Sequence, residues 1–197
     1  MSALSDVDIS QAIEASEIFV DPFDLKLIQP ASLEIRLGEY FKVDHWKERR
    51  ANCDMWYPET IVDPLNPVDH DHWSEEKFVA VGDRYVIRPG EFMLGCSLET
   101  VGIGATLRAN VCGKSSWGRL GLLIHCTAGF IDPGFKGIIT LELYNVSRNS
   151  IYLYPGMRIA QLAFERLITP AQTVYGSPSL GSRYQNQVKA TASRYSA

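Results

Sequence analysis

The residues best suited to chemistry lie in one stretch of the chain, residues 113–145. The stretch opens with a loop that carries two cations and two hydroxyl groups between glycines: Lys114, Ser115, Ser116, Trp117, Gly118 and Arg119. Glycine lets a backbone approach a ligand closely, while Lys, Arg and Ser supply charge and hydrogen bonds for a phosphate. The loop lacks the glycine spacing of a Walker A motif. From the residues alone, a phosphate-binding loop and an ordinary polar turn with a surface ion pair both remain open.

Glu142 is the candidate general base of this stretch. The alternation of Ile139, Leu141 and Leu143 predicts a strand, with Thr140 and Glu142 on its other face. A carboxylate partly desolvated by apolar neighbours suits a general base. The alternative is a glutamate on the solvated face of an antiparallel sheet, and the pattern alone favours that alternative.

Two more polar residues in this stretch have simple structural explanations. Asp132 precedes Pro133 and Gly134, and Asp commonly caps such a turn. His125 lies between Ile124 and a cysteine, so we expect it to be a histidine of the core.

We predict no metal site made by protein side chains. The cluster at residues 69–72, Asp-His-Asp-His, lies in a polar stretch without cysteine partners. The zinc nucleobase-deaminase signature, His-x-Glu followed by Pro-Cys-x-x-Cys, is absent from the sequence. We therefore expect no zinc.

The elements that position these residues are mainly short strands. One helix is predicted near the start, with Ser5 as its N-cap, Asp8 in its first turn and an end near Ser16. Period-two alternation then predicts strands near residues 33–37, 85–87, 92–96, 139–144, 151–153 and 158–166. Pro-Gly pairs at 89–90, 133–134 and 155–156 predict tight turns. This pattern is typical of an all-β sandwich or barrel.

Composition indicates one domain over residues 1–197. The chain has 46% hydrophobic residues and a net charge of −4, which disfavours a nucleic-acid partner. No apolar run is long enough to cross a membrane, and the start lacks a basic region followed by an apolar stretch, so we expect a cytoplasmic protein. We interpret residues 44–77 as an irregular excursion and residues 176–197 as a mobile tail that begins with a flexible linker.

Taken in order, the motifs resemble the dCTP deaminase family, relatives of the trimeric dUTPases. The resemblance rests on the blocks LSDVDI, DPF, QPASLEIRLG, RPGEFMLG, residues 113–145, PGMRIAQL and SRYQNQ. It implies a distorted β-barrel or jelly-roll of the dUTPase-like type, with a short N-terminal helix and a flexible C-terminal tail. It also implies a homotrimer with active sites between subunits, dCTP or dUTP as substrate, Mg²⁺ bound through the substrate phosphates, and dTTP as feedback inhibitor.

The resemblance also assigns roles to residues. Glu142 would activate the water that attacks C4 of cytosine, with Arg119 nearby and Ser115 contacting phosphate and helping to hold the water. The implied substrate-binding residues are Lys114, Ser115, Ser116, Trp117, Gly118, Arg119, Asp132, Thr140, Leu141, Glu142, Gln161, Tyr175, Arg183 and Gln187.

The family divides into enzymes that release dUTP and bifunctional enzymes that form dUMP and diphosphate. The former commonly have Ala-His-Arg before the Ile-Asp-Pro-Gly turn, whereas this chain has Ala128, Gly129 and Phe130. Gly129 and Phe130 therefore suggest the bifunctional branch, in which Asp132 would assist attack of water on the α-phosphate. A deaminase that releases dUTP and a non-catalytic, nucleotide-sensing trimer are the alternatives.

Three residues depart from the family pattern. Trp117 replaces the usual Leu, and Arg183 replaces the frequent Lys. Glu34 replaces the usual Asp, and we expect its carboxylate to be structural.

Overall fold

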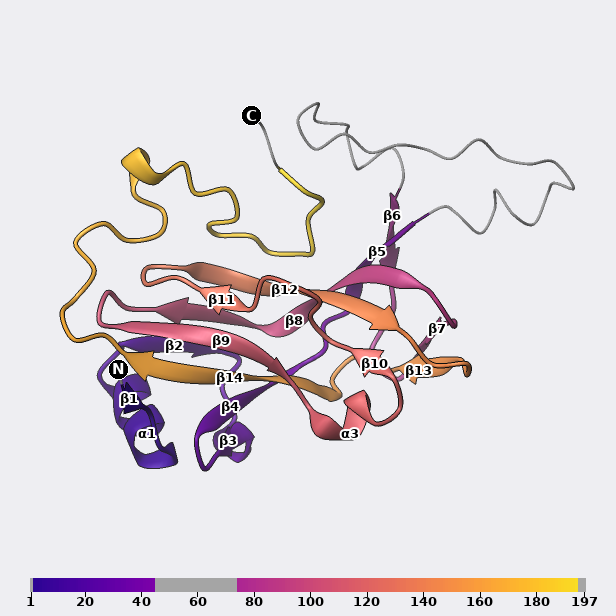
Figure 1. Ribbon diagram of the computed structural model, residues 1–197, viewed down its shortest axis with the longest axis horizontal. Helices are drawn as coiled ribbons and strands as arrows, with labels where there is room; N and C mark the ends of the chain where they lie inside the picture. The colour runs from indigo at the N-terminus through magenta and orange to yellow at the C-terminus, as the bar shows by residue number, and fades with distance from the viewer. Residues whose placement is uncertain (1, 45–73, 195–197) are drawn as a thin grey trace, which may run out of the picture.

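The computed structural model describes residues 2–44 and 74–194 of the chain, and the regular secondary structure of these residues consists mostly of strands (Figure 1). In chain order the elements are β1 (Ser2–Ala3), α1 (Asp6–Glu14), β2 (Ile18–Asp21), η1 (Leu25–Leu27), β3 (Ile28–Gln29), β4 (Ser32–Arg36), β5 (Tyr40–Asp44), β6 (Ser74–Phe78), β7 (Tyr85–Ile87), β8 (Phe92–Ile103), β9 (Leu107–Gly113), α3 (Ser115–Gly118), β10 (Leu122–Leu123), β11 (Phe130–Ile131), β12 (Lys136–Asn145), β13 (Ile151–Leu153), β14 (Arg158–Arg166) and η3 (Pro178–Leu180). None of the helices in this described part is long and apolar enough to cross a membrane.

In the described residues the strands form two six-stranded antiparallel sheets and one two-stranded sheet, in which β13 pairs with β7. One sheet has the order β11-β9-β14-β4-β3 with β1 paired to β14, and the other has the order β10-β12-β8-β5-β6 with β2 paired to β8. Inward-facing residues of both sheets, such as Leu33, Leu141 and Phe164, form one hydrophobic core. The mainly-β prediction is confirmed, and the expected barrel is distorted because the two sheets do not merge into one closed sheet.

The local predictions that rest on adjacent residues are confirmed. Ser5 caps α1 and forms a capping box with Asp8, and the helix ends at Glu14. The strand predicted over residues 158–166 is β14. Gly90, Gly134 and Gly156 all have positive φ, as the tight Pro-Gly turns require.

The predicted irregular excursion over 44–77 is wrong at both of its ends. Asp44 ends β5, and residues 74–77 belong to β6, which pairs with β5 from Tyr40↔Phe78 to Asp44↔Ser74. The strands β5 and β6 pair across a separation of 30 residues or more. Neither strand shows this pairing in its own residue pattern, because the hydrogen-bond partners of each are distant in sequence. Residues 45–73, including the 69–72 cluster, lie outside the described residues.

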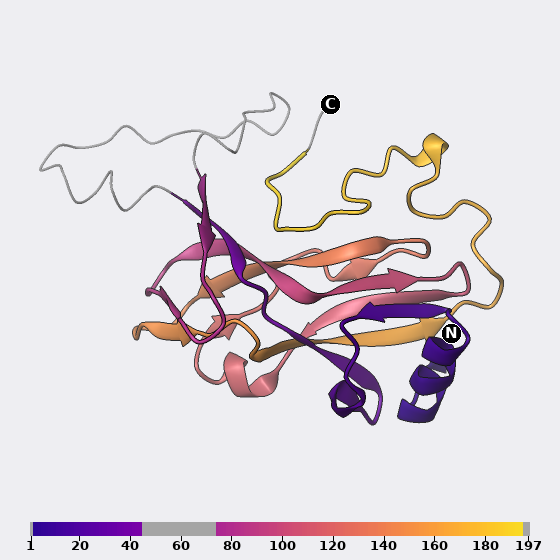
Figure 2. The same ribbon diagram turned by 180° about the vertical axis from the view of Figure 1, so that it is seen from behind.

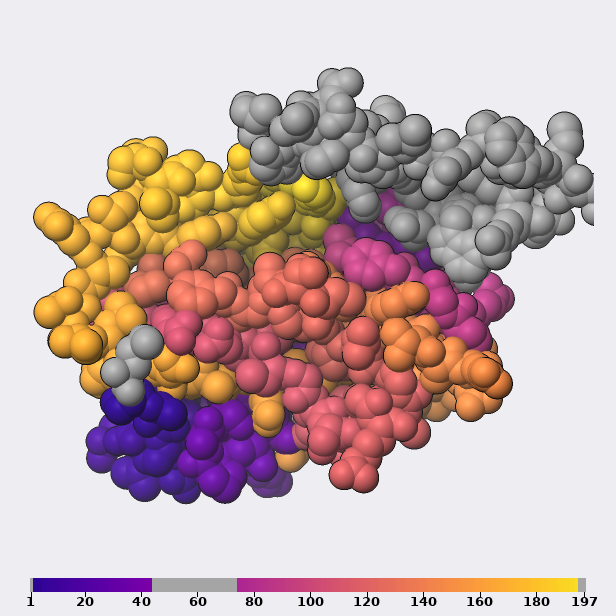
Figure 3. Space-filling view, in the orientation of Figure 1, coloured from indigo at the N-terminus to yellow at the C-terminus, as the bar shows by residue number. Residues whose placement is uncertain are grey.

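The C-terminal segment, residues 172–194, lies along one side of the molecule, next to β11 and β12. Figures 1 and 2 place it on the side opposite α1 and β3, and Figure 3 shows it packed on the body of the protein. Hydrogen bonds of Gln185 and Gln187 with the backbone of β12 hold it in this position. Movement of this tail stays a prediction.

Glu17 fastens the turn after α1 to the end of β14. Its carboxylate accepts hydrogen bonds from both terminal nitrogens of Arg166 at 3.0 and 2.8 Å, and from the Thr106 hydroxyl at 2.7 Å. These bonds, with Arg166 contributing most and Thr106 next, lower the pKa of Glu17 to about 2.

This interaction predicts a pH dependence of stability. Because the folded-state pKa of Glu17 is lowered, its stabilising contribution is present above the ordinary carboxyl pKa and is lost as the pH falls toward 2. We expect Glu17→Gln to lower the urea midpoint at pH 6, with a difference from the wild type that narrows between pH 5 and pH 3. Urea titrations across this range test it, and a difference that stays constant with pH would contradict it.

Candidate active site

A cavity of about 920 Å³ opens between the outer face of β12, strand β11 and the C-terminal segment. Of the predicted site residues, the cavity is lined by Phe130, Asp132, Thr140, Glu142, Tyr175, Arg183 and Gln187. Its volume lies in the range of pockets that hold small-molecule ligands. It brings two carboxylates, one on a strand and one on a turn, to the same space.

Strand β12 presents Glu142 to this cavity. Leu141 and Leu143 are fully buried in the core, so the intervening side chain of Glu142 points the other way. The pairing of β12 with β8 shifts register between Ile138 and Thr140. At this bulge the hydroxyl of Ser97 accepts the Ile139 N–H at 2.8 Å, which satisfies a buried amide. Leu141, an expected substrate residue, can therefore reach a ligand only through its backbone.

The loop after His125 holds the Glu142 carboxylate. Oε2 accepts the backbone N–H groups of Cys126 at 3.1 Å and of Thr127 at 3.0 Å, and the Thr127 hydroxyl lies 3.3 Å from the same oxygen. The other oxygen, Oε1, lies 3.5 Å from that hydroxyl. These bonds fix the orientation of the carboxylate at the cavity wall, which is the arrangement that a positioned general base needs.

Thr127 is not among the site residues predicted from the sequence. It is exposed, and no periodicity marks it, since its contact with Glu142 spans 15 residues of sequence. The sequence feature that points to Thr127 is its position within the stretch 113–145, which carries the other candidate site residues.

His125 is not the core histidine expected from its apolar neighbours. It is half-buried and lines the cavity. A Cβ added to Gly129 would lie 2.8 Å from His125 Nε2 and 2.9 Å from the Val111 carbonyl oxygen. A side chain at this position would force a shift, so glycine at 129 permits the imidazole of His125 and the Val111 carbonyl to lie this close.

Cys126 carries a thiol with a raised pKa beside this carboxylate. Desolvation raises the pKa most, and the charge of Glu142 adds to it. The thiol lies 3.4 Å from the Glu142 carbonyl oxygen. The protonated thiol can therefore donate a weak hydrogen bond to that carbonyl.

The loop 114–119 and Gln161 do not line this cavity. Ser115, Ser116 and Arg119 are exposed on α3 and at its end. Figures 1 and 2 place α3 on the lower side of the molecule and the C-terminal segment on the upper side. Within one chain, the structure therefore does not bring Ser115 and Arg119 to Glu142.

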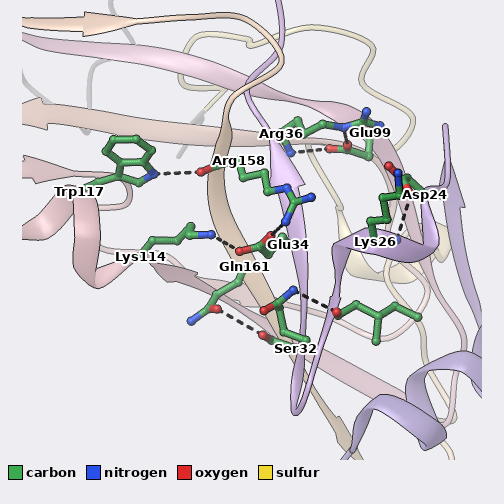
Figure 4. Close-up of polar contacts among 12 residues, drawn as sticks. Asp24, Lys26, Ser32, Glu34, Arg36, Glu99, Lys114, Trp117, Arg158 and Gln161 are labelled. Carbon is green, nitrogen blue, oxygen red and sulfur yellow. Dashed lines mark hydrogen bonds and ion pairs between the residues drawn. The ribbon is translucent and has the colours of Figure 1, made fainter.

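An ion-pair network beneath this loop involves two of the departures from the family pattern. Glu34 is buried and pairs with Lys114 and, at 2.9 Å, with Arg158 (Figure 4). The indole N–H of Trp117 donates to the Arg158 carbonyl at 2.9 Å. The carboxylate of Glu34 is thus structural, as expected, and Trp117 ties α3 to the start of β14.

Gln161 lies on the same sheet as this network. Its side-chain oxygen accepts the Ser32 hydroxyl at 3.2 Å (Figure 4). This contact lies across the β14–β4 pair, away from the cavity residues of the same chain.

The C-terminal segment forms the outer wall of the cavity. Gln187 donates from Nε2 to the Ile138 carbonyl at 2.8 Å, and the Thr140 hydroxyl lies 3.2 Å away. Lys189 pairs with Glu76 of β6 at 2.5 Å. Tyr175 packs against Phe135, with ring centroids 5.8 Å apart. The segment thus covers β12 around the bulge.

The sequence and fold match known proteins over most of the chain. The family model described as dCTP deaminase-like matches residues 3–167. The chain is 50% identical over 190 residues to the "dCTP deaminase, dUMP-forming" of Tropheryma whipplei strain Twist, covering 96% of this chain and 91% of the relative. It is 46% identical over 191 residues to the protein of the same description from Corynebacterium efficiens, covering 97% and 93%.

A solved structure shares the fold. The 2′-deoxycytidine 5′-triphosphate deaminase from Agrobacterium tumefaciens aligns with a TM-score of 0.60 and 22% identity, over 84% of this chain and 48% of that one. This chain thus spans about half the length of that protein. The match of the family model to residues 3–167, together with relatives at 46–50% identity, shows that the chain belongs to the dCTP deaminase-like family.

Proposed function

We propose that this chain is a dCTP deaminase that releases ammonia from the cytosine ring and cleaves the triphosphate, forming dUMP and diphosphate. The observation that carries the proposal is the placement of Glu142 at the cavity wall, held by the amides of Cys126 and Thr127. The two relatives described as dUMP-forming support the same product. Release of dUTP and a non-catalytic sensor are not favoured by these relatives.

Glu142 acts as the base in the deamination step. Its carboxylate takes a proton from water, and the resulting hydroxide adds to C4 of cytosine. The protonated Glu142 carboxyl then gives this proton to the departing amino group. Ammonia leaves and the ring becomes uracil. The apolar lining from Leu94, Phe130 and Ile139 limits the water around the reacting carbon.

Asp132 serves the phosphate step. It lies on the turn between β11 and β12 and lines the same cavity as Glu142. A carboxylate at this position can orient a second water for attack on the α-phosphate, which breaks the bond to the diphosphate leaving group. Gly129 and Phe130, just before this turn, shape the wall where that step takes place.

The site is completed by a neighbouring subunit of a homotrimer. The exposed residues Ser115, Ser116 and Arg119 lie outside the cavity of their own chain, although their chemistry suits a phosphate and a developing negative charge. Three exposed apolar side chains lie near this loop: Leu120 and Leu123 follow it in sequence, and Val146 donates its backbone N–H to the Gly121 carbonyl at 2.9 Å. A symmetric assembly can bury them and bring each loop to the next subunit's Glu142.

Mg²⁺ enters as part of the substrate, bound to the triphosphate. Among the described residues, no group of three or more His, Cys, Asp or Glu side chains could hold a metal ion. Asp132 lines the cavity and can therefore face a metal–phosphate complex bound there. We include dTTP as feedback inhibitor and a cytoplasmic location in this proposal.

Ammonia release from dCTP tests the proposed deamination. We expect turnover of dCTP in the presence of Mg²⁺, and loss of most activity when the ion is removed by a chelator, because the free triphosphate repels the carboxylates. Turnover should return when Mg²⁺ is restored in excess. Absence of ammonia from Mg–dCTP at saturating substrate would contradict the proposal.

A further inference from the structure

Both the sheet and the C-terminal segment hold the turn that carries Asp132. Within the turn, the Phe135 N–H donates to the Asp132 carbonyl at 3.2 Å, and toward the end of β8 the Gly134 N–H donates to the Ile103 carbonyl at 2.8 Å. From the C-terminal segment, the Tyr175 N–H donates a hydrogen bond to the Pro133 carbonyl at 2.8 Å.

Gln185 makes the most specific contact with this turn. Its Nε2 donates to the Gly134 carbonyl at 2.9 Å, and its Oε1 accepts the Lys136 N–H at 3.0 Å. One side-chain amide thus satisfies a carbonyl and an N–H two residues apart, as a neighbouring strand would. The next residue, Asn186, continues the contact by donating its N–H to the Lys136 carbonyl at 2.7 Å.

Two glycines allow close packing, one beside Gln185 and one between the turn and the segment that carries Gln185. A Cβ at Gly176 would lie 2.8 Å from Gln185 Nε2, and a Cβ at Gly134 would lie 2.6 Å from Val174 Cβ. Both glycines also have positive φ, +92° and +90°. The backbone at Gly176 therefore approaches the Gln185 amide closely, while the turn at Gly134 packs directly against Val174 and Tyr175.

We propose that Gln185 is a positioning residue for the phosphate step: it fixes the turn at residues 132–136 and so aims the Asp132 carboxylate. This inference rests on the proposed function. Glu142 is held separately, by the Cys126 and Thr127 amides and by its strand. Loss of the Gln185 contacts therefore affects Asp132 more than Glu142.

The test compares Gln185→Met, which keeps the side-chain length but removes both polar groups, with Gln172→Met, an exposed position in the same segment. Two lost hydrogen bonds, each a factor of about five in an equilibrium constant, weaken the docked turn about 25-fold. We expect Gln185→Met to raise the share of dUTP among the products at least severalfold and to raise KM for dCTP. Ammonia release at saturating dCTP should stay within a few-fold of the wild type, and Gln172→Met should match the wild type.

A second variant and a second measurement separate this role from simple loss of folding. The Cβ added in Gly176→Ala would lie 2.8 Å from Gln185 Nε2 and displace that amide, so this variant should shift the products in the same direction. In Gln185→Met, hydrogen exchange of the Lys136 amide should be faster, whether or not the enzyme forms dUMP. Equal loss of both catalytic steps, or an unchanged product ratio with normal ammonia release, would overturn the proposal. A wild type that releases dUTP alone would instead refute the proposed dUMP formation, and the exchange result would still report on the Gln185 contact.

Discussion

Replacing Glu142 by Gln is expected to lower the rate of dCTP deamination by about 10²–10⁴-fold, the range that general acid–base catalysis contributes. The amide has nearly the shape of the carboxylate, but it cannot take the proton from water. Binding should change little, because the cavity lining and the C-terminal segment remain in place. Initial rates of ammonia release at saturating dCTP, with the affinity for dCTP measured separately, check this result.

The matched control for this substitution is Glu75→Gln, an exposed glutamate on strand β6. It should keep the wild-type rate. Deamination by the Glu142→Gln protein within a few-fold of the wild type would remove Glu142 from the role of base.

Replacing Arg119 by Met is expected to reduce turnover by about 10²-fold or more, the cost of losing one donor to a developing negative charge. Arg119 does not line the cavity of its own chain. Its replacement therefore lowers turnover this much only if Arg119 enters the site of a neighbouring subunit. Arg148→Met, at another exposed arginine, should have no such effect.

Mixed assemblies test the shared site directly. When Glu142→Gln and Arg119→Met subunits are unfolded together and refolded at equal amounts, every mixed trimer contains one site with both native residues. Random mixing then gives about one quarter of the wild-type activity from two nearly inactive proteins. Activity that stays at the level of the parent variants, in samples shown by light scattering to be trimers and by native mass spectrometry to be mixed, would place Glu142 and Arg119 in one chain or in no common site.

The parts of the fold that follow from neighbouring residues are predictable from the sequence. The Ser5 cap with Asp8, the strand over residues 158–166 and the Pro-Gly turns each depend on local propensity. Strand β9 is not among the predicted strands. Its buried face consists of Leu107, Ala109 and Val111, and the small Ala109 at the centre weakens the alternation of large apolar and polar residues. The two-residue strands β10 and β11 are defined by partners about 20 residues away, and two residues are too few to show a periodicity.

The candidate site depends more heavily on contacts between distant residues. By pattern alone Glu142 belongs on a solvated face, and only the fold of the loop at Cys126 and Thr127 shows that its carboxylate is held. The Gly- and Ser-rich composition after residue 176 suggests a linker, but Gln185 and Gln187 dock this segment on β12. The grouping of Arg119 with Glu142 comes from the family resemblance, since one chain does not contain it.

The most direct test of the account is the identity of the products formed from Mg–dCTP by the purified protein. Chromatography separates dCTP, dUTP and dUMP, and diphosphate is assayed in the same samples. We predict dUMP and diphosphate in equal amounts, ammonia in the same amount, and little free dUTP at any time. Accumulation of dUTP without diphosphate would contradict the assignment of Asp132 to phosphate cleavage, and absence of any product would contradict the assignment of Glu142 as well.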